Sequence, residues 1–479
     1  MRILTLSILL WLVAIQQPAA QKTGLYFNES FRPQYHFSVE NGILGESGAL
    51  LYSDATYHLF FTYSPTLQAE GIFRWGHAIS NDLIHWTRQS DPQFHGGEQG
   101  ICPPGPGSAL VDYQNKLGFN EGSQPAWIAW FSTAECGVQM AYSNDQGKNW
   151  NIHANKIGLP SEEITLQSVP RVFWYQQGAH YVMILHRRPE TDERTRGFSV
   201  YNALDGLNWT FESHIPGFKG TPDLFELFAN SRPEEAKWVL MEGDGSYVVG
   251  TFNGKVYTPE SIRMKSDFGS DYTAPRIFAN LPEAENRILQ LGFLRGSQHD
   301  ESGWIGQATF PSELSLKRFH NGVFLIRQPL SEIQDIQGKI QRWESVNLIP
   351  GINKNLIRKV KGDRVHIKGE FDLKTCDSFG LMLRMGKNSA GTELVYNVRR
   401  QTLSILGQTI TLEPVDNKIY LEILLDRSSL EVYANNGRAV ISTSFHPVAN
   451  AMNYLLYNTG GELKVDKLEV HEIKQIWRE

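Results

Sequence analysis

The carboxylate whose surroundings best suit chemistry is Glu46, in a glycine-punctuated stretch, Gly42–Gly48 (GILGESG). This stretch lies between an aromatic segment and an alternating apolar strand, so we predict an irregular loop. In a repeat-built β protein such a loop usually lines a central opening, where a carboxylate can act as a nucleophile or a proton carrier. The competing interpretation is that Glu46 is a solvated loop acid.

Metal chemistry has no support in the sequence. No cysteines pair at short spacing and no His-x-x-x-His occurs on a helix, so we predict no metal and no cofactor. Three cysteines cannot form a disulfide framework for a chain of 479 residues. Cys102 and Cys136 either pair with each other or are buried as free thiols, and Cys376 is expected to be unpaired.

The elements that must position Glu46 are predicted to be strands. Apolar alternating runs recur every fifty to seventy residues or so, a period typical of blade architectures. The runs are Tyr57–Tyr63, Trp127–Thr133, His180–His186, Lys237–Glu242 and Arg287–Leu294. Because five such units are visible, we predict a five-bladed β-propeller over residues 25–330.

Three of these runs are followed by a second strand and a turn that closes on tryptophan. The segments are Trp75–Trp86, Gly137–Trp150 and Gly197–Trp209. Ser-Asn-Asp or Asp-Gly makes a tight turn, and the Trp packs the next strand against its neighbour, so these residues are predicted to be structural. A fourth hairpin, Met241–Gly254, repeats the pattern without the Trp.

The pattern changes after residue 330. Leu330–Gln337 (LSEIQDIQ) has the best helical signal, and we place a linker helix over residues 331–342. Residues 343–479 contain regularly spaced short strands with turn residues such as Asn435-Asn436-Gly437, which is typical of a β-sandwich. The predicted fold is all-β, with a propeller followed by a C-terminal sandwich.

Several motifs carry a family resemblance. RPQYHF, WGHAISNDLIHW, VPRVFW, TPDLFEL, GTFNG, FPSEL and DRSSLEVYANNG occur in an order that resembles the β-fructofuranosidases (invertases, levanases and inulinases) of glycoside hydrolase family 32. The resemblance runs from about Arg32 to Glu472. It implies a five-bladed propeller joined to a sandwich, in agreement with the periodicity, and a sucrose or fructan-type carbohydrate as partner.

The resemblance also implies where catalysis would occur. Retaining glycosidases need a carboxylate nucleophile and an acid/base carboxyl about 5 Å apart. Glu46 stands where the family motif W-M-N-D-P-N-G has its nucleophilic Asp. The family's R-D-P is Ser168–Pro170 here, and its E-C-P-D is Gly220–Asp223. Val169 and Gly220 therefore replace the transition-state-stabilising Asp and the acid/base Glu.

Four residues are predicted to bind substrate: Glu46, Trp75, His77 and Asp223, the last three of which remain from the family pattern. We assign no catalytic residue. A general acid is worth about two to four orders of magnitude in rate, so we expect fructoside hydrolysis to be undetectable or nearly so.

Two functions therefore remain open. The first is a pseudoenzyme that keeps the fold and has a carbohydrate-binding or interaction role. The alternative is an active β-fructofuranosidase with Glu46 as nucleophile and a relocated acid/base. Other acids near the vacated position are Asp223, Glu226, Glu242 and Asp244.

Residues 1–20 have the pattern of a secretory signal peptide. One positive charge at Arg2 precedes an apolar run, Ile3–Ile15, which is too short to span a bilayer with margin. We therefore expect a secreted, extracellular protein. Sequons at Asn28 and Asn208 fit a glycoprotein. A formal net charge of −6 without a dense Lys/Arg cluster argues against nucleic acid, and no membrane span is predicted.

Overall fold

The computed structural model describes most of the chain after residue 26. The described residues are 27, 29–67, 73–96, 102, 104–133, 136–153, 157, 159, 168–187, 196–282, 285–296, 303–352 and 355–477. The expected signal peptide and the sequon asparagine at position 28 lie outside them. Among the described residues no helix is long and apolar enough to cross a membrane.

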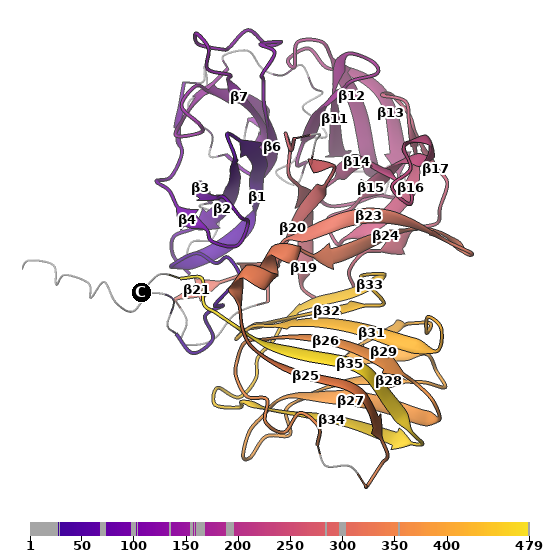
Figure 1. Cartoon of the computed structure of the whole chain (residues 1–479). Coiled ribbons are helices and arrows are strands. Elements are labelled where there is room, and N and C mark those ends of the chain that lie inside the picture. Colours follow the sequence, from indigo (N-terminus) through magenta and orange to yellow (C-terminus); the bar gives the residue numbers. More distant parts are fainter. Residues whose placement is uncertain are drawn as a thin grey trace, which may run out of the picture.

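Five sheets form a β-propeller around a central axis (Figure 1). The first contains β21 (Trp304–Ile305), β1 (Gly42–Ser53), β2 (Thr56–Ser64), β3 (Arg74–Ser80) and β4 (Thr87–Arg88). The second contains β6 (Gly107–Val111), β7 (Trp127–Thr133), β8 (Gly137–Ser143), β9 (Asn149–Ile152) and β5 (Gln93–His95). The third contains β10 (Arg171–Tyr175), β11 (His180–Arg187), β12 (Gly197–Ala203) and β13 (Thr210–Pro216).

The last two sheets complete the circle. The fourth contains β14 (Asp223–Phe228), β15 (Ala236–Met241), β16 (Ser246–Phe252), β17 (Tyr257–Pro259) and β18 (Met264–Lys265), with the 3₁₀ helix η3 (Pro233–Glu235) between β14 and β15. The fifth contains β19 (Tyr272–Ile277), β20 (Ile288–Leu294), β22 (Gln307–Ala308), β23 (Ser312–Phe319) and β24 (Gly322–Pro329). Because β21 pairs with β1, late propeller residues are joined to the first blade.

The predicted propeller is confirmed, and each predicted apolar run corresponds to the second strand of a blade. These strands are β2, β7, β11, β15 and β20. Each lies inside its own sheet; all seven residues of β7 are buried, whereas the first three residues of β15 are only partly buried. Burial on both faces replaces strict alternation with a nearly continuous apolar run.

The tryptophan-closed turns are structural, as predicted. The indole N–H of Trp86 donates to the Leu83 carbonyl at 3.0 Å, and Trp150 and Trp209 make the same bond to glycines three residues earlier. All three rings are buried. The turn and its Trp thus form one repeated unit that fixes the outer edge of three blades.

The inner strand of each blade faces the propeller axis. These strands are β1, β6, β10, β14 and β19, each the first full strand of its blade. β1 contacts β6 and β19, β6 contacts β10, and β14 contacts β19. An ion pair between Arg171 and Asp223 joins β10 to β14 and completes the ring.

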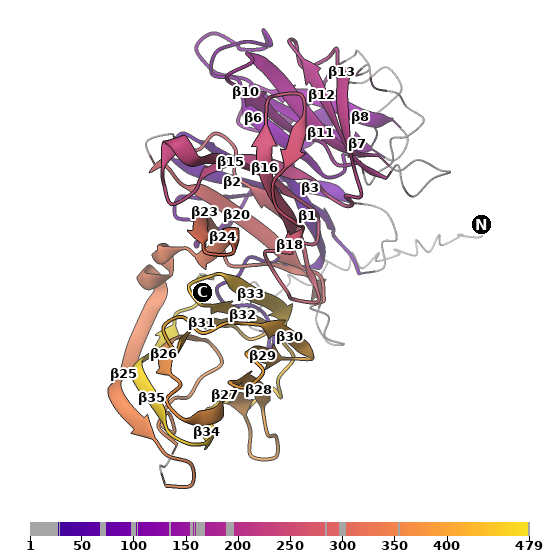
Figure 2. The same cartoon turned by 90° about the vertical axis from the view of Figure 1, so that its right-hand side faces the viewer.

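The C-terminal β-sandwich is also confirmed. One sheet has the order β25 (Gln337–Leu348), β35 (Leu463–Ile473), β26 (Val365–Asp372), β31 (Lys418–Leu425), β32 (Ser429–Ala434), β33 (Ala439–Ser444). The other has the order β30 (Gln408–Thr411), β29 (Thr402–Ile405), β28 (Thr392–Asn397), β27 (Cys376–Met385), β34 (Asn453–Gly460). Figure 2 shows the sandwich beneath the propeller, with β33 on the side nearest to it.

The linker differs from the helix expected over residues 331–342. The 3₁₀ helix η5 spans Ser331–Ile336, and β25 begins at Gln337. Ile333 and Ile336 of η5 are buried, which accounts for its amphipathic signal. The remaining residues pair with β35 as the edge strand of the sandwich.

Of the alternatives left open for the cysteines, the structure contains the disulfide. Cys102 and Cys136 are bonded, with their Cα atoms 6.4 Å apart, while Cys376 is free and buried. The bond connects the segment before β6 to the turn between β7 and β8. It therefore holds one end of the second blade.

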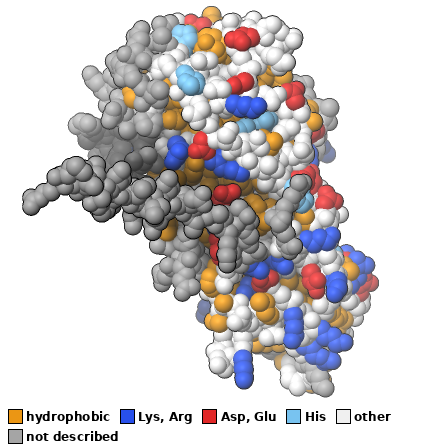
Figure 3. Space-filling model, turned by 90° about the vertical axis from the view of Figure 1, so that its left-hand side faces the viewer, with side chains coloured by type: hydrophobic (Ala, Val, Ile, Leu, Met, Phe, Trp, Pro, Cys, Tyr) orange, Lys and Arg blue, Asp and Glu red, His pale blue; other side chains and the backbone are white. Residues whose placement is uncertain are grey.

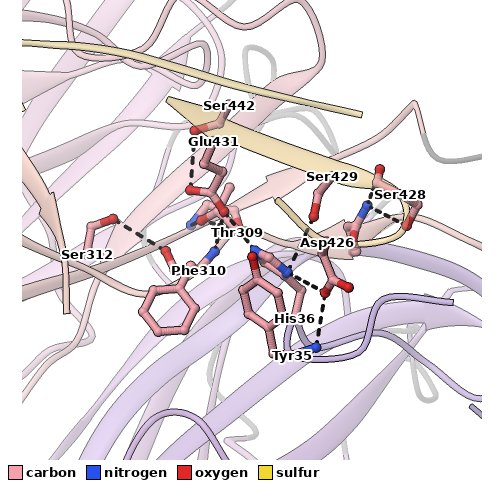
Figure 4. A network of polar contacts seen from close by, with 12 residues as sticks. Tyr35, His36, Thr309, Phe310, Ser312, Asp426, Ser428, Ser429, Glu431 and Ser442 are labelled. Carbon is pink, nitrogen blue, oxygen red and sulfur yellow. Dashed lines mark hydrogen bonds and ion pairs between the residues drawn. The ribbon is translucent and has the colours of Figure 1, made fainter. Parts of the chain in front are cut away.

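A buried charged network joins the two domains (Figure 4). His36, just before the first blade, contacts Asp426 at 2.9 Å and Glu431 at 3.0 Å, and all three side chains have no exposed area. Beside it, Arg327 of β24 pairs with Asp267 at 2.7 Å. Because both domains supply charges, the network fixes how they are docked.

Acidic and basic side chains are interspersed over the face seen in Figure 3. On the lower part of this face, over the sandwich, Lys and Arg side chains outnumber acidic ones, whereas the two signs are more evenly mixed over the propeller.

Candidate functional site

Glu46 lies on the inner strand β1 at an irregularity in its pairing with β2. Its backbone N–H donates to the Thr62 Oγ1 at 3.0 Å, and the Thr62 hydroxyl donates back to the Glu46 carbonyl at 3.1 Å. Bulges of this kind re-aim a side chain and are frequent beside active sites. Glu46 is thus in a strand rather than in the loop predicted for Gly42–Gly48.

The Glu46 carboxylate is engaged by two partners from other blades. Thr221 Oγ1 donates to Oε2 at 3.1 Å, and Arg295 forms an ion pair with Oε1. The Glu46 side chain is 17% exposed and that of Arg295 60% exposed. Glu46 is therefore held at the axis rather than free in solvent, and the Arg295 pair lies at the solvent side.

Asp223 begins β14 and is fully buried. Its Oδ2 accepts the Ile277 N–H at 2.9 Å, while Oδ1 accepts the Leu224 N–H at 3.0 Å and pairs with Arg171 Nε at 2.9 Å. One carboxylate thereby connects three inner strands, β10, β14 and β19. In this structure both of its oxygens are occupied by the protein.

Arg276 of β19 is the most unusual group at the axis. Its side chain is buried, with the residue 3% exposed, and none of its three guanidinium nitrogens has a hydrogen-bond partner in the part of the chain that the structure describes. Burial lowers the pKa of Arg276 to about 10, although Asp223 and Glu46 act in the opposite direction. Arg276 therefore lies within electrostatic range of both acids and is paired with neither.

The two vacated positions carry no ionisable group. Val169 is 3% exposed and precedes β10 by two residues. Gly220 has a φ of +74°, and a Cβ there would lie 3.3 Å from the Gly243 Cα. The backbone at position 220 thus favours glycine.

Glu242 is the acid linked most directly to the vacated acid/base position. It is 2% exposed, and its Oε1 accepts the backbone N–H of Lys219, the neighbour of Gly220, at 2.9 Å. Burial raises the pKa of Glu242, in part offset by Lys219 and Arg263. A raised pKa is what a proton donor needs.

Trp75 and His77 of β3 lie between blades. Trp75 is 1% exposed, its indole N–H donates to the Gly105 carbonyl at 2.8 Å, and its ring covers Gly48. His77 is 4% exposed, stacks on Phe60 at 4.2 Å, and has a pKa lowered by burial to about 3. Both are packing residues in this structure, and their substrate-binding roles stay predictions.

Sequence reasoning missed four residues of this site: Arg171, Thr221, Arg276 and Arg295. Arg171 and Thr221 lie inside motifs that were examined for their missing carboxylates. Arg276 and Arg295 carry no local signal, because only the closing of the ring brings them near Glu46 and Asp223. An arginine in an otherwise apolar strand, as in TAPRIF, was the available sign.

The chain is an all-β propeller with acidic residues on its inner strands, joined to a sandwich. Residues 36–329 match the glycosyl hydrolases family 32 N-terminal domain, and residues 332–472 match the glycosyl hydrolases family 32 C-terminal domain. The chain belongs to glycosyl hydrolase family 32.

Similar proteins agree with this assignment. A levanase from Bacillus subtilis (strain 168) is 30% identical over 521 residues, covering 99% of this chain and 75% of that protein. A levanase from Bacillus sp. (strain L7) is 27% identical over 518 residues, which is 95% of this chain. The chain spans 53% of the length of that second levanase.

Among solved structures, the exo-inulinase from Aspergillus awamori has a TM-score of 0.81 at 23% identity, covering 94% of this chain and 100% of that one. Fructan 1-exohydrolase IIa from Cichorium intybus has a TM-score of 0.78 at 18% identity, covering 93% and 98%. At these identities the likeness concerns the fold.

Proposed function

We propose that this protein is a secreted pseudoenzyme that binds carbohydrate at the propeller axis without hydrolysing it. The proposal rests on which residues occupy the three positions where the family resemblance places catalytic carboxylates. Val169 and Gly220 supply no acid, and the one remaining carboxylate, Glu46, is engaged by Thr221 and Arg295.

The missing acid/base is the larger loss. Cleavage of a glycosidic bond needs a proton on the departing oxygen, and a positioned acid contributes about two to four orders of magnitude in rate. Gly220 has no side chain to donate it. Because its φ is +74°, the backbone is also shaped for glycine rather than for a glutamate.

The engagement of Glu46 adds to that loss. A nucleophilic carboxylate must present a free oxygen lone pair to the anomeric carbon. One Glu46 oxygen accepts the Thr221 hydroxyl, and the other pairs with Arg295. Each oxygen keeps a second lone pair, but the two donors stabilise the negative charge of Glu46 and so weaken it as a nucleophile.

Binding of carbohydrate is favoured by the family and by the retained axis. The relatives are named as a levanase, an exo-inulinase and a fructan exohydrolase, so sucrose or a fructan-type sugar is the first ligand to test. Secretion is supported by the N-terminal pattern and by the disulfide, which suits an oxidising compartment. Asn208 is exposed, as a glycosylation acceptor must be.

The second candidate is an active glycosidase in which Glu242 replaces the missing acid. Its raised pKa and its contact with the neighbour of Gly220 favour this alternative. Against it, the Glu242 side chain is 2% exposed, which leaves little room for a leaving group to approach.

The experiment is calorimetric titration of the purified secreted protein with inulin and levan oligosaccharides, with product analysis of the same samples. We expect heat of binding without release of fructose. Fructose release that is lost in Glu242→Gln would establish the second candidate. Absence of both binding and release would contradict the carbohydrate-binding role and leave a protein partner.

A further inference from the structure

Five charged groups of the described residues, linked through Glu46 and Asp223, do not balance at the propeller axis. Arg171 pairs with Asp223, and Arg295 pairs with Glu46. Arg276 is the third guanidinium of this cluster, and its electrostatic neighbours are Asp223, Arg171 and Glu46. The five groups therefore carry one positive charge in excess, and that charge belongs to Arg276.

The Arg276 guanidinium is buried without an acceptor. A guanidinium carries five N–H donors in a fixed planar fork, and its three nitrogens here have no hydrogen-bond partner among the described residues. A buried cation without an acceptor is strongly unfavourable, because it loses its hydration and gains nothing in exchange. Such a group is stable where a ligand supplies the missing acceptor.

The chemistry of the missing acceptor follows from the shape of the donor. A planar fork matches the two oxygens of a carboxylate, sulfate or phosphate and binds them with paired hydrogen bonds. Neutral sugar hydroxyls accept only weakly by comparison. The unmet donors of Arg276 are therefore suited to an anionic group.

Arg295 makes the axis accessible to an anionic group from the solvent side. Its side chain is 60% exposed at the solvent side of the cluster, so water partly screens its pair with Glu46. An incoming anion can take Arg295 from Glu46 at small cost. Arg276 is within electrostatic range of the same Glu46 carboxylate, so an anion that takes the place of Glu46 beside Arg295 lies near Arg276 as well.

We propose that the propeller axis binds a carbohydrate bearing a carboxylate, sulfate or phosphate, with Arg276 and Arg295 as the anion-binding residues. This inference rests on the proposed function, because it names the class of sugar bound at the same site. The net charge of −6 gives the chain no general attraction for anions, so the selectivity must come from this cluster.

The test is calorimetric titration of the full secreted protein at low salt with fructose, fructose 6-phosphate, glucuronate and inorganic phosphate. We expect at least one acidic sugar to bind about tenfold or more tightly than fructose, and also more tightly than inorganic phosphate. Comparison of fructose 6-phosphate with glucuronate identifies whether a phosphate or a carboxylate is preferred.

Arg276→Gln and Arg295→Gln are each expected to weaken binding of the acidic sugar about tenfold or more. The matched control is Arg318→Gln, an exposed arginine paired with Glu235 on the outer part of the propeller, which should leave binding unchanged. Because Arg276 is buried, a variant there can fail to fold, and Arg295→Gln therefore tests the proposal independently.

A further measurement separates a ligand role from a structural one. Arg276→Met removes the unpaired cation at similar length, so it should raise the Tm of the ligand-free protein. A lower Tm would reveal a structural partner and overturn the proposal.

Three binding results would also overturn it: no binding of either acidic sugar, equal affinity for fructose and the acidic sugars, or equal affinity for inorganic phosphate alone. Release of fructose from sucrose or inulin by the same sample would contradict the pseudoenzyme function instead. The two failures are therefore distinguishable.

Discussion

Gly220 has a backbone conformation that a side chain would disfavour. Its φ of +74° lies in the left-handed region, and a Cβ would approach the Gly243 backbone at 3.3 Å. The backbone conformation at position 220 therefore also disfavours an acidic residue there. Reintroducing glutamate there would strain the strand entrance beside Asp223.

Gly220→Ala is expected to lower the free energy of unfolding by about 1–2 kcal/mol, through the left-handed φ and the close approach to Gly243. Gly407→Ala is the matched control, because Gly407 has a φ of +78° with no atom within 4 Å of a Cβ. Urea denaturation should show the larger loss for Gly220→Ala. Wild-type stability in Gly220→Ala would show that the position accepts a side chain freely.

The residues of the site were predictable to different degrees. Glu46, Val169 and Gly220 were found because they stand at fixed places in recognisable motifs. Arg276 was not, because its meaning depends on Glu46 and Asp223, which are 230 and 53 positions away in the sequence. An arginine without an acidic neighbour in the sequence becomes informative only when the fold shows that no described residue accepts a hydrogen bond from it.

Some strands of the propeller can be predicted clearly from the sequence, and others cannot. The second strands, such as β7, are buried on both faces and read as apolar runs. The inner strands β10, β14 and β19 are short and carry Arg171, Asp223 and Arg276. Their polar residues interrupt the apolar pattern, so the strands nearest the site were the hardest to predict.

The tryptophan-closed turn of the second blade should be a main source of its stability. Trp150 is fully buried, and its neighbour Gly147 packs against the Phe60 ring of the first blade. Trp150→Ala is expected to cost about 3–5 kcal/mol through the cavity and the lost N–H bond. The control Leu204→Ala removes a side chain that is 78% exposed and should have little effect on the Tm. Equal Tm values for the two variants would contradict this role.

The docking of the propeller on the sandwich depends on buried charge. Burial alone would lower the pKa of His36, but the hydrogen bonds that His36 donates to Asp426 and Glu431 outweigh it and raise the pKa to about 9. Burial would raise the pKa of both acids, yet contacts with His36 leave them lowered. Leu424 and Tyr433 of the sandwich share an apolar cluster with Phe310 around this network.

The sign of the pH dependence follows from these shifts. The contribution of His36 is complete below its unfolded pKa of 6.5 and is lost as pH rises through about 9. The contribution of Asp426 is present above its unfolded pKa of 3.8 and is lost as pH falls. The network should therefore stabilise the docked domains most between the two unfolded pKa values, 3.8 for Asp426 and 6.5 for His36.

His36→Gln is expected to lower the free energy of unfolding by about 3–5 kcal/mol near pH 6, because it leaves two buried carboxylates without their cation. The difference in Tm from the wild type should shrink above pH 9. His85→Gln breaks an exposed pair with Asp82 and serves as the control. A difference in Tm that does not change with pH would contradict the charged role of His36.

The measurement that tests the pseudoenzyme proposal most directly is the initial rate of fructose release from sucrose and inulin. The purified protein is compared with Glu46→Gln and with a blank without protein. We predict that both proteins give the rate of the blank, because no acid stands at Gly220 and Glu46 is engaged. A rate above the blank that Glu46→Gln abolishes would show an active glycosidase and contradict the account.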